Sequence, residues 1–349
     1  MRISDFSIMI SAWGTHYCSP SELNDVCVHA EELGFHSIGV PHVPILPGPE
    51  DLPASPIADP EQVSISKPFK FFTAERQYSQ HDPLVLVPMA LQVTKRIKIG
   101  FNVVVTPWHH PYQWAKYMAS LDAASGGRFV AGFGLGYVQR TGAVRLVDQI
   151  GIDSKKRGAM SDEALEYITR LWTCNDPLSF DGTYYVGRDL VVDPKPVQKP
   201  YPELWWAGNV PAAIPRSLKY ASYLEIAYPR LSAARSLAAK LKDEAQRQGS
   251  SCRFAALIYM NVVPGAKRNT SMVDELFEVT FPGTEEHESM AVGDPEHCAR
   301  VIKTFAAAGV DHFAFDMQRH GRDPITAHHD QMELFVKEVL PLLADPPRN

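Results

Sequence analysis

Two short apolar segments joined by an amphipathic helix constrain the fold more than any other feature of the sequence. Residues 97–105 and 129–133 are rich in β-branched and aromatic side chains and too short for core helices, which predicts buried strands. Pro111 opens the segment between them, at a helix position where its missing N–H costs nothing. A strand, a helix and a second strand in this order are the unit of a parallel sheet.

The same alternation extends over the rest of the chain. Ser19 begins an S-P-S-E capping box with proline at the first helical position, and Gly34 marks the end of that helix. Similar signals at Asp294 and Gly309 predict the last helix. The other predicted strands are residues 3–11, 36–40, 203–207, 223–227, 254–262 and 312–316. Eight strands with intervening helices predict an α/β fold, a (β/α)8 TIM barrel.

The length of the chain agrees with one barrel. Chains of 349 residues commonly form a single α/β barrel, and no linker divides this one, which predicts one domain over residues 1–349. Two irregular stretches interrupt the repeat: one near 43–82 is rich in proline, and one near 264–293 is acidic. We expect them to be insertions at the carboxy-terminal mouth of the barrel, acting either as lids or as surface loops.

Composition argues against several classes of function. The net charge is −6 and Lys and Arg are scattered, which argues against a nucleic-acid-binding surface. No stretch approaches the roughly 20 apolar residues of a membrane span, and no basic-then-apolar leader is present, so a soluble cytoplasmic protein is expected. The five cysteines are dispersed without a C-x-x-C pair, which favours reduced thiols over a metal or dithiol site.

Several short motifs follow one another in a fixed order through most of the chain. They are T-x-R-I-x-x-G at 94–100, H-P at 110–111, L-D-x-x-S-x-G-R at 121–128, G-x-G-x-G at 132–136, S-F-D-G at 179–182 and D-P-K-P-V-Q at 193–198. By these motifs the chain resembles the luciferase-like flavin monooxygenase superfamily, which also contains deazaflavin-dependent oxidoreductases. The resemblance implies a barrel whose strand ends hold a flavin or a deazaflavin.

The glycine-rich strand is one part of the implied cofactor site. Glycines at alternate positions share one face of a strand, and without side chains they let a planar ring or its phosphate arm approach the backbone. The alternative is that the glycines only admit a neighbouring side chain. The implied cofactor contacts on this segment are Gly134, Leu135, Gly136 and Tyr137.

A turn after residues 203–207 is the second part of the implied site. Gly208, Asn209 and Val210 lead from a strand into a helix, whose free N–H groups and dipole favour a phosphate. Hydroxyl residues common in the family's turn are missing here, so backbone amides and Asn209 remain as donors. The resemblance also brings Arg157 to the phosphate, and the alternative for Arg157 is an exposed helix charge.

Asn102 and Val103 form the third part. A polar side chain within an apolar strand is unfavourable unless it has a partner. In the family the corresponding position lies beneath the flavin ring beside a non-proline cis peptide bond, so a cis bond between Asn102 and Val103 is expected. The alternative is a core asparagine that neighbouring carbonyl groups satisfy.

Two histidines are candidates for proton handling, and two tryptophans for the substrate pocket. His42 follows the second strand, near a position where relatives carry an acidic residue and a histidine, and it can titrate near neutral pH. His110 precedes Pro111, where helix capping explains it as well as catalysis does. Trp13 and Trp108 lie at strand ends and either wall an aromatic pocket or pack structurally.

The resemblance implies an oxidoreductase in which a flavin carries the redox chemistry. The leading interpretation is a two-component monooxygenase, which takes reduced FMN from a separate flavin reductase and uses O2 to oxygenate a small organic substrate. The alternatives are hydride transfer with the deazaflavin coenzyme F420 and a non-catalytic barrel subunit. A homodimer or homotetramer is also implied, and no metal site is expected.

Overall fold

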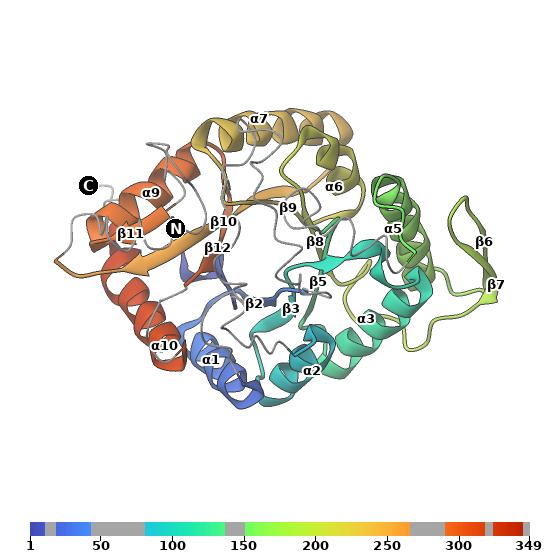
Figure 1. Cartoon of the computed structure of the whole chain (residues 1–349), viewed down its shortest axis with the longest axis horizontal. Coiled ribbons are helices and arrows are strands. Elements are labelled where there is room, and N and C mark those ends of the chain that lie inside the picture. The colour runs from blue at the N-terminus through green and yellow to red at the C-terminus, as the bar shows by residue number, and fades with distance from the viewer. Residues whose placement is uncertain (11–18, 43–80, 137–150, 266–289, 318–323, 345–349) are drawn as a thin grey trace.

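Parallel strands close into a barrel that helices surround (Figure 1). The computed structural model describes residues 1–10, 19–42, 81–136, 151–265, 290–317 and 324–344. Round the barrel the eight strands are β1 (Phe6–Met9), β2 (Ser37–Val40), β3 (Lys98–Phe101), β5 (Phe129–Gly134), β8 (Glu203–Ala207), β9 (Tyr223–Ala227), β10 (Arg253–Val262) and β12 (His312–Asp316). Strand β12 pairs with β1 and closes the sheet. The predicted TIM barrel is confirmed.

Helices with clear start and stop signals cover the outside of the barrel. In α1 (Pro20–Leu33) the Ser19 hydroxyl accepts a hydrogen bond from the Glu22 N–H at 3.3 Å, and Gly34 ends the helix with a φ of 87°. In α9 (Pro295–Ala307) Asp294 caps in the same way. The others are α2 (Pro83–Val93), α3 (Pro111–Ser125), α5 (Arg157–Thr173), α6 (Ile214–Tyr220), α7 (Leu231–Gln248), α10 (Pro324–Leu334) and α11 (Leu340–Leu343).

Four details differ from the sequence predictions. The strand predicted at 97–105 is divided into β3 and β4 (Val104–Val105), and the first strand is shorter because Ile3–Asp5 form a 3-10 turn. Helix α9 is not the last, because α10 and α11 follow it. Residues Met290–Gly293, assigned to the second insertion, form β11, which pairs with the end of β10. The other residues of the insertions near 43–82 and 264–293 lie mostly outside the described part of the chain.

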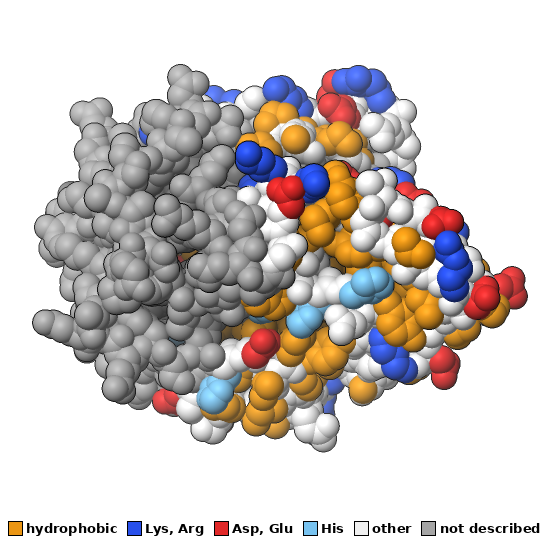
Figure 2. Space-filling model, turned by 45° about the vertical axis from the view of Figure 1, so that its right-hand side comes forward, with side chains coloured by type: hydrophobic (Ala, Val, Ile, Leu, Met, Phe, Trp, Pro, Cys, Tyr) orange, Lys and Arg blue, Asp and Glu red, His pale blue; other side chains and the backbone are white. Residues whose placement is uncertain are grey.

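An antiparallel hairpin of β6 (Leu178–Asp181) and β7 (Val186–Leu190) projects beside α5 (Figure 1). Glu163 of α5 fixes its turn, because the carboxylate accepts hydrogen bonds from the N–H groups of residues 183, 184 and 185 at 2.7–2.8 Å. Figure 2 shows acidic, basic and hydrophobic side chains interspersed over the described part of one face. None of the helices described is long and apolar enough to cross a membrane.

Alternate residues of the barrel strands point into the interior and pack in layers. One buried layer consists of Val130, Trp205, Tyr223 and Ala255. A second consists of Met9, Ala227, Leu257 and Ala314. Glu225 lies on β9 between Tyr223 and Ala227, two residues that belong to these layers, so its side chain also points into the barrel.

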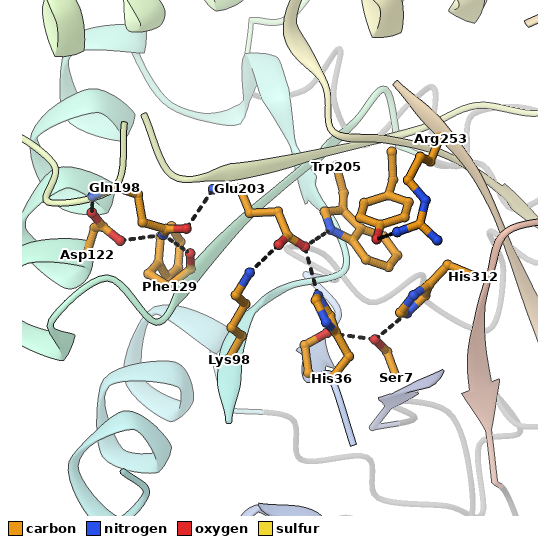
Figure 3. A network of polar contacts seen from close by, with 12 residues as sticks. Ser7, His36, Lys98, Asp122, Phe129, Gln198, Glu203, Trp205, Arg253 and His312 are labelled. Carbon is orange, nitrogen blue, oxygen red and sulfur yellow. Dashed lines mark hydrogen bonds and ion pairs between the residues drawn. The ribbon is translucent and has the colours of Figure 1, made fainter. Parts of the chain in front are cut away.

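A network of polar side chains fills the amino-terminal end of the barrel (Figure 3). Glu203, the first residue of β8, is its centre: the carboxylate accepts a hydrogen bond from Trp205 Nε1 at 2.7 Å, lies 3.1 Å from His36 Nε2 and pairs with Lys98. Burial alone would raise the pKa of Glu203, but the contacts with His36 and Lys98 lower it well below its usual range. We call the barrel plug these four residues together with Ser7, Ser37, Tyr223, Arg253 and His312, which are described next.

The rest of the plug comes from the first two residues of other strands. Ser7 Oγ lies 2.8 Å from Ser37 Oγ and 2.7 Å from His312 Nε2, and Arg253 donates to the hydroxyl of Tyr223 at 2.8 Å. Burial holds the pKa of His312 well below its ordinary value. The plug occupies the amino-terminal end of the barrel, so we expect the reactive groups at the carboxy-terminal mouth, where barrel enzymes bind their substrates.

Candidate active site at the carboxy-terminal mouth

The chain between β3 and β4 forms a bulge at the mouth of the barrel. The peptide bond between Asn102 and Val103 is cis, which confirms the expectation from the resemblance. The Asn102 N–H donates to the carbonyl of Val40 at 3.0 Å, and the His42 N–H donates to the carbonyl of Val103 at 3.4 Å. The end of β2 and the bulge are therefore held together by their backbones.

The glycines of β5 make room for this bulge. A Cβ atom at Gly132 would lie 1.9 Å from the carbonyl oxygen of Phe101, and one at Gly134 would lie 2.7 Å from Cγ2 of Val103. Both positions thus require glycine for packing, which is the alternative that the sequence left open. Leu135 is half-buried and Gly136 is exposed, and their contact with a cofactor stays a prediction. Tyr137 and Trp13 lie outside the described residues.

Asn102 reaches across the barrel to a carboxyl group that the sequence analysis missed. Its Nδ2 donates to Oε2 of Glu225 at 2.9 Å. Glu225 is only 1% exposed, and burial raises its pKa to about 7, although the bond from Asn102 acts in the opposite direction. The sequence signal for this carboxyl group was a single glutamate within the apolar strand Y-L-E-I-A. Alternation of side chains along the strand directs this glutamate into the barrel.

His42 is buried at the end of β2 beside the bulge. Its Nδ1 accepts a hydrogen bond from the Val105 N–H at 3.4 Å, which assigns the proton of the neutral ring to Nε2. Nε2 is buried, and none of the described residues is its hydrogen-bond partner. Burial lowers the pKa of His42 to about 4; nearby His109 acts in the same direction and Asp82 opposes it. His42 is therefore a neutral, oriented hydrogen-bond donor.

The structure brings Trp108 to His42 but gives His110 another role. The Trp108 ring lies 5.9 Å from the His42 ring, centre to centre and nearly perpendicular, so the two rings pack edge to face after the ends of β4 and β2. His110 caps α3: its Nδ1 accepts from the Tyr112 N–H at 3.2 Å, and its ring lies 5.5 Å from that of Tyr185. This capping is the alternative that the sequence left open, and a catalytic role for His110 stays a prediction.

The turn after β8 is held by its own asparagine. The Gly208 N–H donates to the carbonyl of Glu225 at 2.9 Å. The Asn209 amide donates to the carbonyl of Ala227 at 3.2 Å and accepts from the N–H of Ala227 at 3.0 Å. Because the side chain of Asn209 is engaged with β9, the backbone amides of the turn, near exposed Val210, are left as the main candidates for anion binding.

Arg157 is half-buried at the start of α5. Its Nη1 donates to the carbonyl of Ser154 at 2.9 Å, while its Nε is buried and has no hydrogen-bond partner in the described part of the chain. Arg216 of α6 donates to the carbonyl of Gly158 at 3.1 Å and pairs with Asp162 at 2.6 Å. These bonds tie the start of α5 to α6, the helix that follows the turn at Gly208. Arg157 itself is half-buried and bonded to Ser154, so it is not the fully exposed helix charge of the alternative.

The sequence comparisons identify the family. The family model described as luciferase-like monooxygenase matches residues 6–277. The chain belongs to this luciferase-like family. An FMNH2-dependent dimethylsulfone monooxygenase of Pseudomonas putida is 29% identical over 135 residues, a match that covers 39% of this chain and only 36% of that protein. An F420-dependent glucose-6-phosphate dehydrogenase of Amycolatopsis mediterranei is 25% identical, over 93% of this chain and 95% of that protein.

Solved structures of similar fold include monooxygenases and F420-dependent enzymes. The monooxygenase RslO1 from Streptomyces bottropensis has a TM-score of 0.75 at 17% identity, covering 97% of this chain and 99% of its own. An F420-dependent secondary alcohol dehydrogenase has a TM-score of 0.70 at 19% identity, covering 99% of this chain and 100% of its own. At 17–19% identity these structures are evidence for the fold alone, and the predicted luciferase-like barrel is confirmed.

Proposed function

We propose that the protein is a flavin-dependent monooxygenase that binds reduced FMN at the carboxy-terminal mouth and oxygenates a small organic substrate with O2. The observation that carries the proposal is the buried Nε2 of neutral His42, which follows the carboxy-terminal end of β2 beside Trp108 and has no hydrogen-bond partner among the described residues. A buried donor of this kind is unfavourable unless a ligand accepts its hydrogen bond. When bound, the flavin supplies the redox chemistry with oxygen.

The residues of the mouth have distinct proposed roles. His42 donates a hydrogen bond to the cofactor or the substrate, Trp108 excludes water, and Asn102 with Val103 supports the cofactor ring. Arg157 and the backbone of residues 208–210 hold the phosphate. The buried Nε atom of Arg157, which has no hydrogen-bond partner within the described ranges, and the backbone amides of the turn fit this assignment, because both offer donors to an anion.

Hydride transfer with F420 is the second candidate function. It is favoured by one observation: the match to the F420-dependent glucose-6-phosphate dehydrogenase extends over nearly the whole of both chains, whereas the match to the dimethylsulfone monooxygenase is partial. The two proposals share one site and differ in the cofactor. Anaerobic titrations with reduced FMN and with reduced F420 distinguish them: tighter binding of FMN supports the first, and exclusive binding of F420 overturns it.

Arg157→Ala is expected to weaken the binding of reduced FMN by about 1–3 kcal/mol, the range for a charge-assisted hydrogen bond. The loss should be smaller for riboflavin, which lacks the phosphate. Fluorescence titration measures both affinities, and Lys155→Ala, an exposed neighbour, is the control. Equal affinity of Arg157→Ala and wild type for FMN would remove Arg157 from the site.

A homodimer is proposed on the basis of an apolar stripe on α2. Val85, Met89 and Val93 are 53%, 39% and 43% exposed and recur every four residues, so they share one helix face. Met89→Glu should convert dimers to monomers, because an unpaired charge buried at an interface costs about 3 kcal/mol or more. Light scattering after gel filtration measures the mass. Leu342→Glu, which alters an exposed leucine on α11, should leave the mass unchanged, and a monomeric wild type would contradict the proposal.

The remaining partners follow from the proposed reaction. A two-component monooxygenase needs a separate flavin reductase, and we propose that this reductase delivers reduced FMN in the cytoplasm. A purified reductase with a nicotinamide cofactor should then support turnover, while oxidised FMN alone should not.

A further inference from the structure

A buried carboxyl group lies in the barrel interior next to the proposed cofactor site. Glu225 is 1% exposed, and its register partners on the two neighbouring strands are the small residues Ala207 and Ala255. A glutamate in such surroundings pays a desolvation penalty that apolar packing cannot offset. Its presence in place of an apolar residue therefore calls for a functional explanation.

The partner of Glu225 connects it to the mouth. Nδ2 of Asn102 donates a hydrogen bond to Oε2 of Glu225 at 2.9 Å, and Asn102 itself is partly exposed. Among the described residues none donates a hydrogen bond to Asn102 Oδ1. The backbone of Asn102 is held by its bond to the carbonyl of Val40, and its side chain lies against Gly39, where a Cβ atom would come within 2.5 Å of the Asn102 Cβ. The main freedom of Asn102 is thus rotation of its terminal amide.

The charged groups around Glu225 are engaged elsewhere. On the adjacent strands the titratable residues are Glu203 of β8 and Arg253 and Tyr259 of β10. Glu203 and Arg253 belong to the barrel plug, as does Tyr223 on β9 itself, and the ring of Tyr259 stacks on that of Tyr228 with 4.4 Å between the ring centres. His312 and Asp316 lie at the two ends of β12. No cation contributes to the raised pKa of Glu225, which burial causes. A carboxyl group with a pKa of about 7 exchanges a proton with solvent near neutral pH.

We propose that Glu225 is a positioning residue that orients the amide of Asn102 at the cofactor site and, by gaining or losing one proton, decides which amide atom faces the mouth. Ionised Glu225 accepts from Asn102 Nδ2, so Oδ1 is presented as an acceptor. Protonated Glu225 donates its O–H to Oδ1, and the amide turns to present Nδ2 as a donor. The step moves one proton between the carboxyl group and solvent. The proposal rests on the proposed function for the identity of the ligand.

The first test needs no cofactor. In protein labelled with ¹⁵N at asparagine side chains, the Asn102 amide signal is identified by its loss in Asn102→Ala. We expect this signal to shift between pH 6 and pH 8 in wild type and to stay constant in Glu225→Gln, which can accept the same bond but cannot titrate. Glu203→Gln, which alters the other glutamate on the described barrel strands, is the matched control and should shift like wild type. A constant signal in wild type, or the same shift in Glu225→Gln, would overturn the proposal.

The second test measures cofactor binding. The dissociation constant for reduced FMN is followed from pH 6 to pH 8, and the ratio between wild type and Glu225→Gln cancels the ionisation of the flavin itself. The ratio should change by about fivefold or more, the usual size of a coupling between two sites. A constant ratio would contradict a positioning role, because a merely structural glutamate gives no pH dependence.

The two tests separate the inference from the proposed function. If neither reduced FMN nor reduced F420 binds, the proposed function fails, and the amide signal still decides whether Glu225 orients Asn102. Glu225→Ala should bind reduced FMN about tenfold more weakly at pH 8, the equivalent of one lost hydrogen bond, and Glu225→Gln should restore the affinity. Urea midpoints of all variants show whether each is folded, and failure of Gln to restore binding in a folded variant counts against the proposal.

Discussion

Replacing His42 by alanine should lower turnover by about 10²–10⁴-fold, the usual contribution of a positioned proton donor or acceptor. The reason is the geometry of the ring: Nδ1 is held by the Val105 N–H, so Nε2 is the atom that can donate at the mouth. Affinity for the reduced cofactor should fall by no more than one hydrogen bond contributes, about 0.5–1.5 kcal/mol, because the proposed phosphate contacts come from other elements. Turnover is measured with any substrate that the wild-type protein oxidises.

Two further variants sharpen the test of His42. His42→Gln places an amide nitrogen near the position of Nε2 and should recover part of the activity. His109→Ala removes a neighbouring half-buried ring that packs on Trp114 at 4.7 Å, and it should change turnover little. Because the pKa of His42 is about 4, the ring is neutral between pH 6 and pH 8, and His42 should produce no pH dependence in that range. Equal turnover of His42→Ala and wild type would make His42 structural.

The largest expected effect on stability comes from the barrel plug. Glu203→Ala should lower the free energy of unfolding by about 3–5 kcal/mol, because removing one partner of a buried ion pair leaves the others uncompensated. The Glu203 side chain is 11% exposed, and its carboxylate contacts Trp205, His36 and Lys98. Urea unfolding followed by tryptophan fluorescence measures the change. A loss of less than about 1 kcal/mol, the range of a surface salt bridge, would show that the plug is not the support we describe.

A matched control and a pH series belong to the same experiment. Glu32→Ala alters a glutamate that is 68% exposed and should stay within about 0.5 kcal/mol of wild type.

The plug also predicts that acid lowers the stability of the fold. His312 is held neutral in the fold, while the unfolded chain binds a proton below pH 6.5, so stability should fall as pH decreases through that value. Below pH 4.5 Glu203 adds to the loss, because its pKa is depressed only in the folded state.

The sequence predicted the barrel because its signals are local. The strands β8, β9 and β12 have the predicted bounds, since each is a short apolar run that turn residues or charges delimit. Helix α2 escaped notice because Pro83 and Pro88 and a nearly uniform apolar composition hide its periodicity. The pattern of apolar residues did not predict that the strand at 97–105 is divided, because Val103 continues the apolar run. Only the family resemblance predicted the cis bond.

The site was harder to predict than the fold, because its chemistry depends on contacts between distant residues. Asn102 and Glu225 are 123 positions apart, and no spacing rule links them. The sequence identified Asn209 by its type, yet its amide bonds Ala227 of the neighbouring strand, a contact that requires the closed barrel. Likewise, His42 and His110 are equivalent as residue types, and only burial and capping distinguish the neutral donor from the helix cap.

One measurement tests the proposed monooxygenase most directly: rapid mixing of the reduced FMN complex with O2 while the absorbance of the bound flavin is followed. The account predicts two phases, separated by a transient species whose spectrum differs from reduced and from oxidised FMN, with reoxidation slower than that of free flavin. The His42→Ala variant should bind FMN and shorten the life of this species. Direct reoxidation at the rate of free FMN, or binding of reduced F420 alone without reaction with O2, would contradict the account.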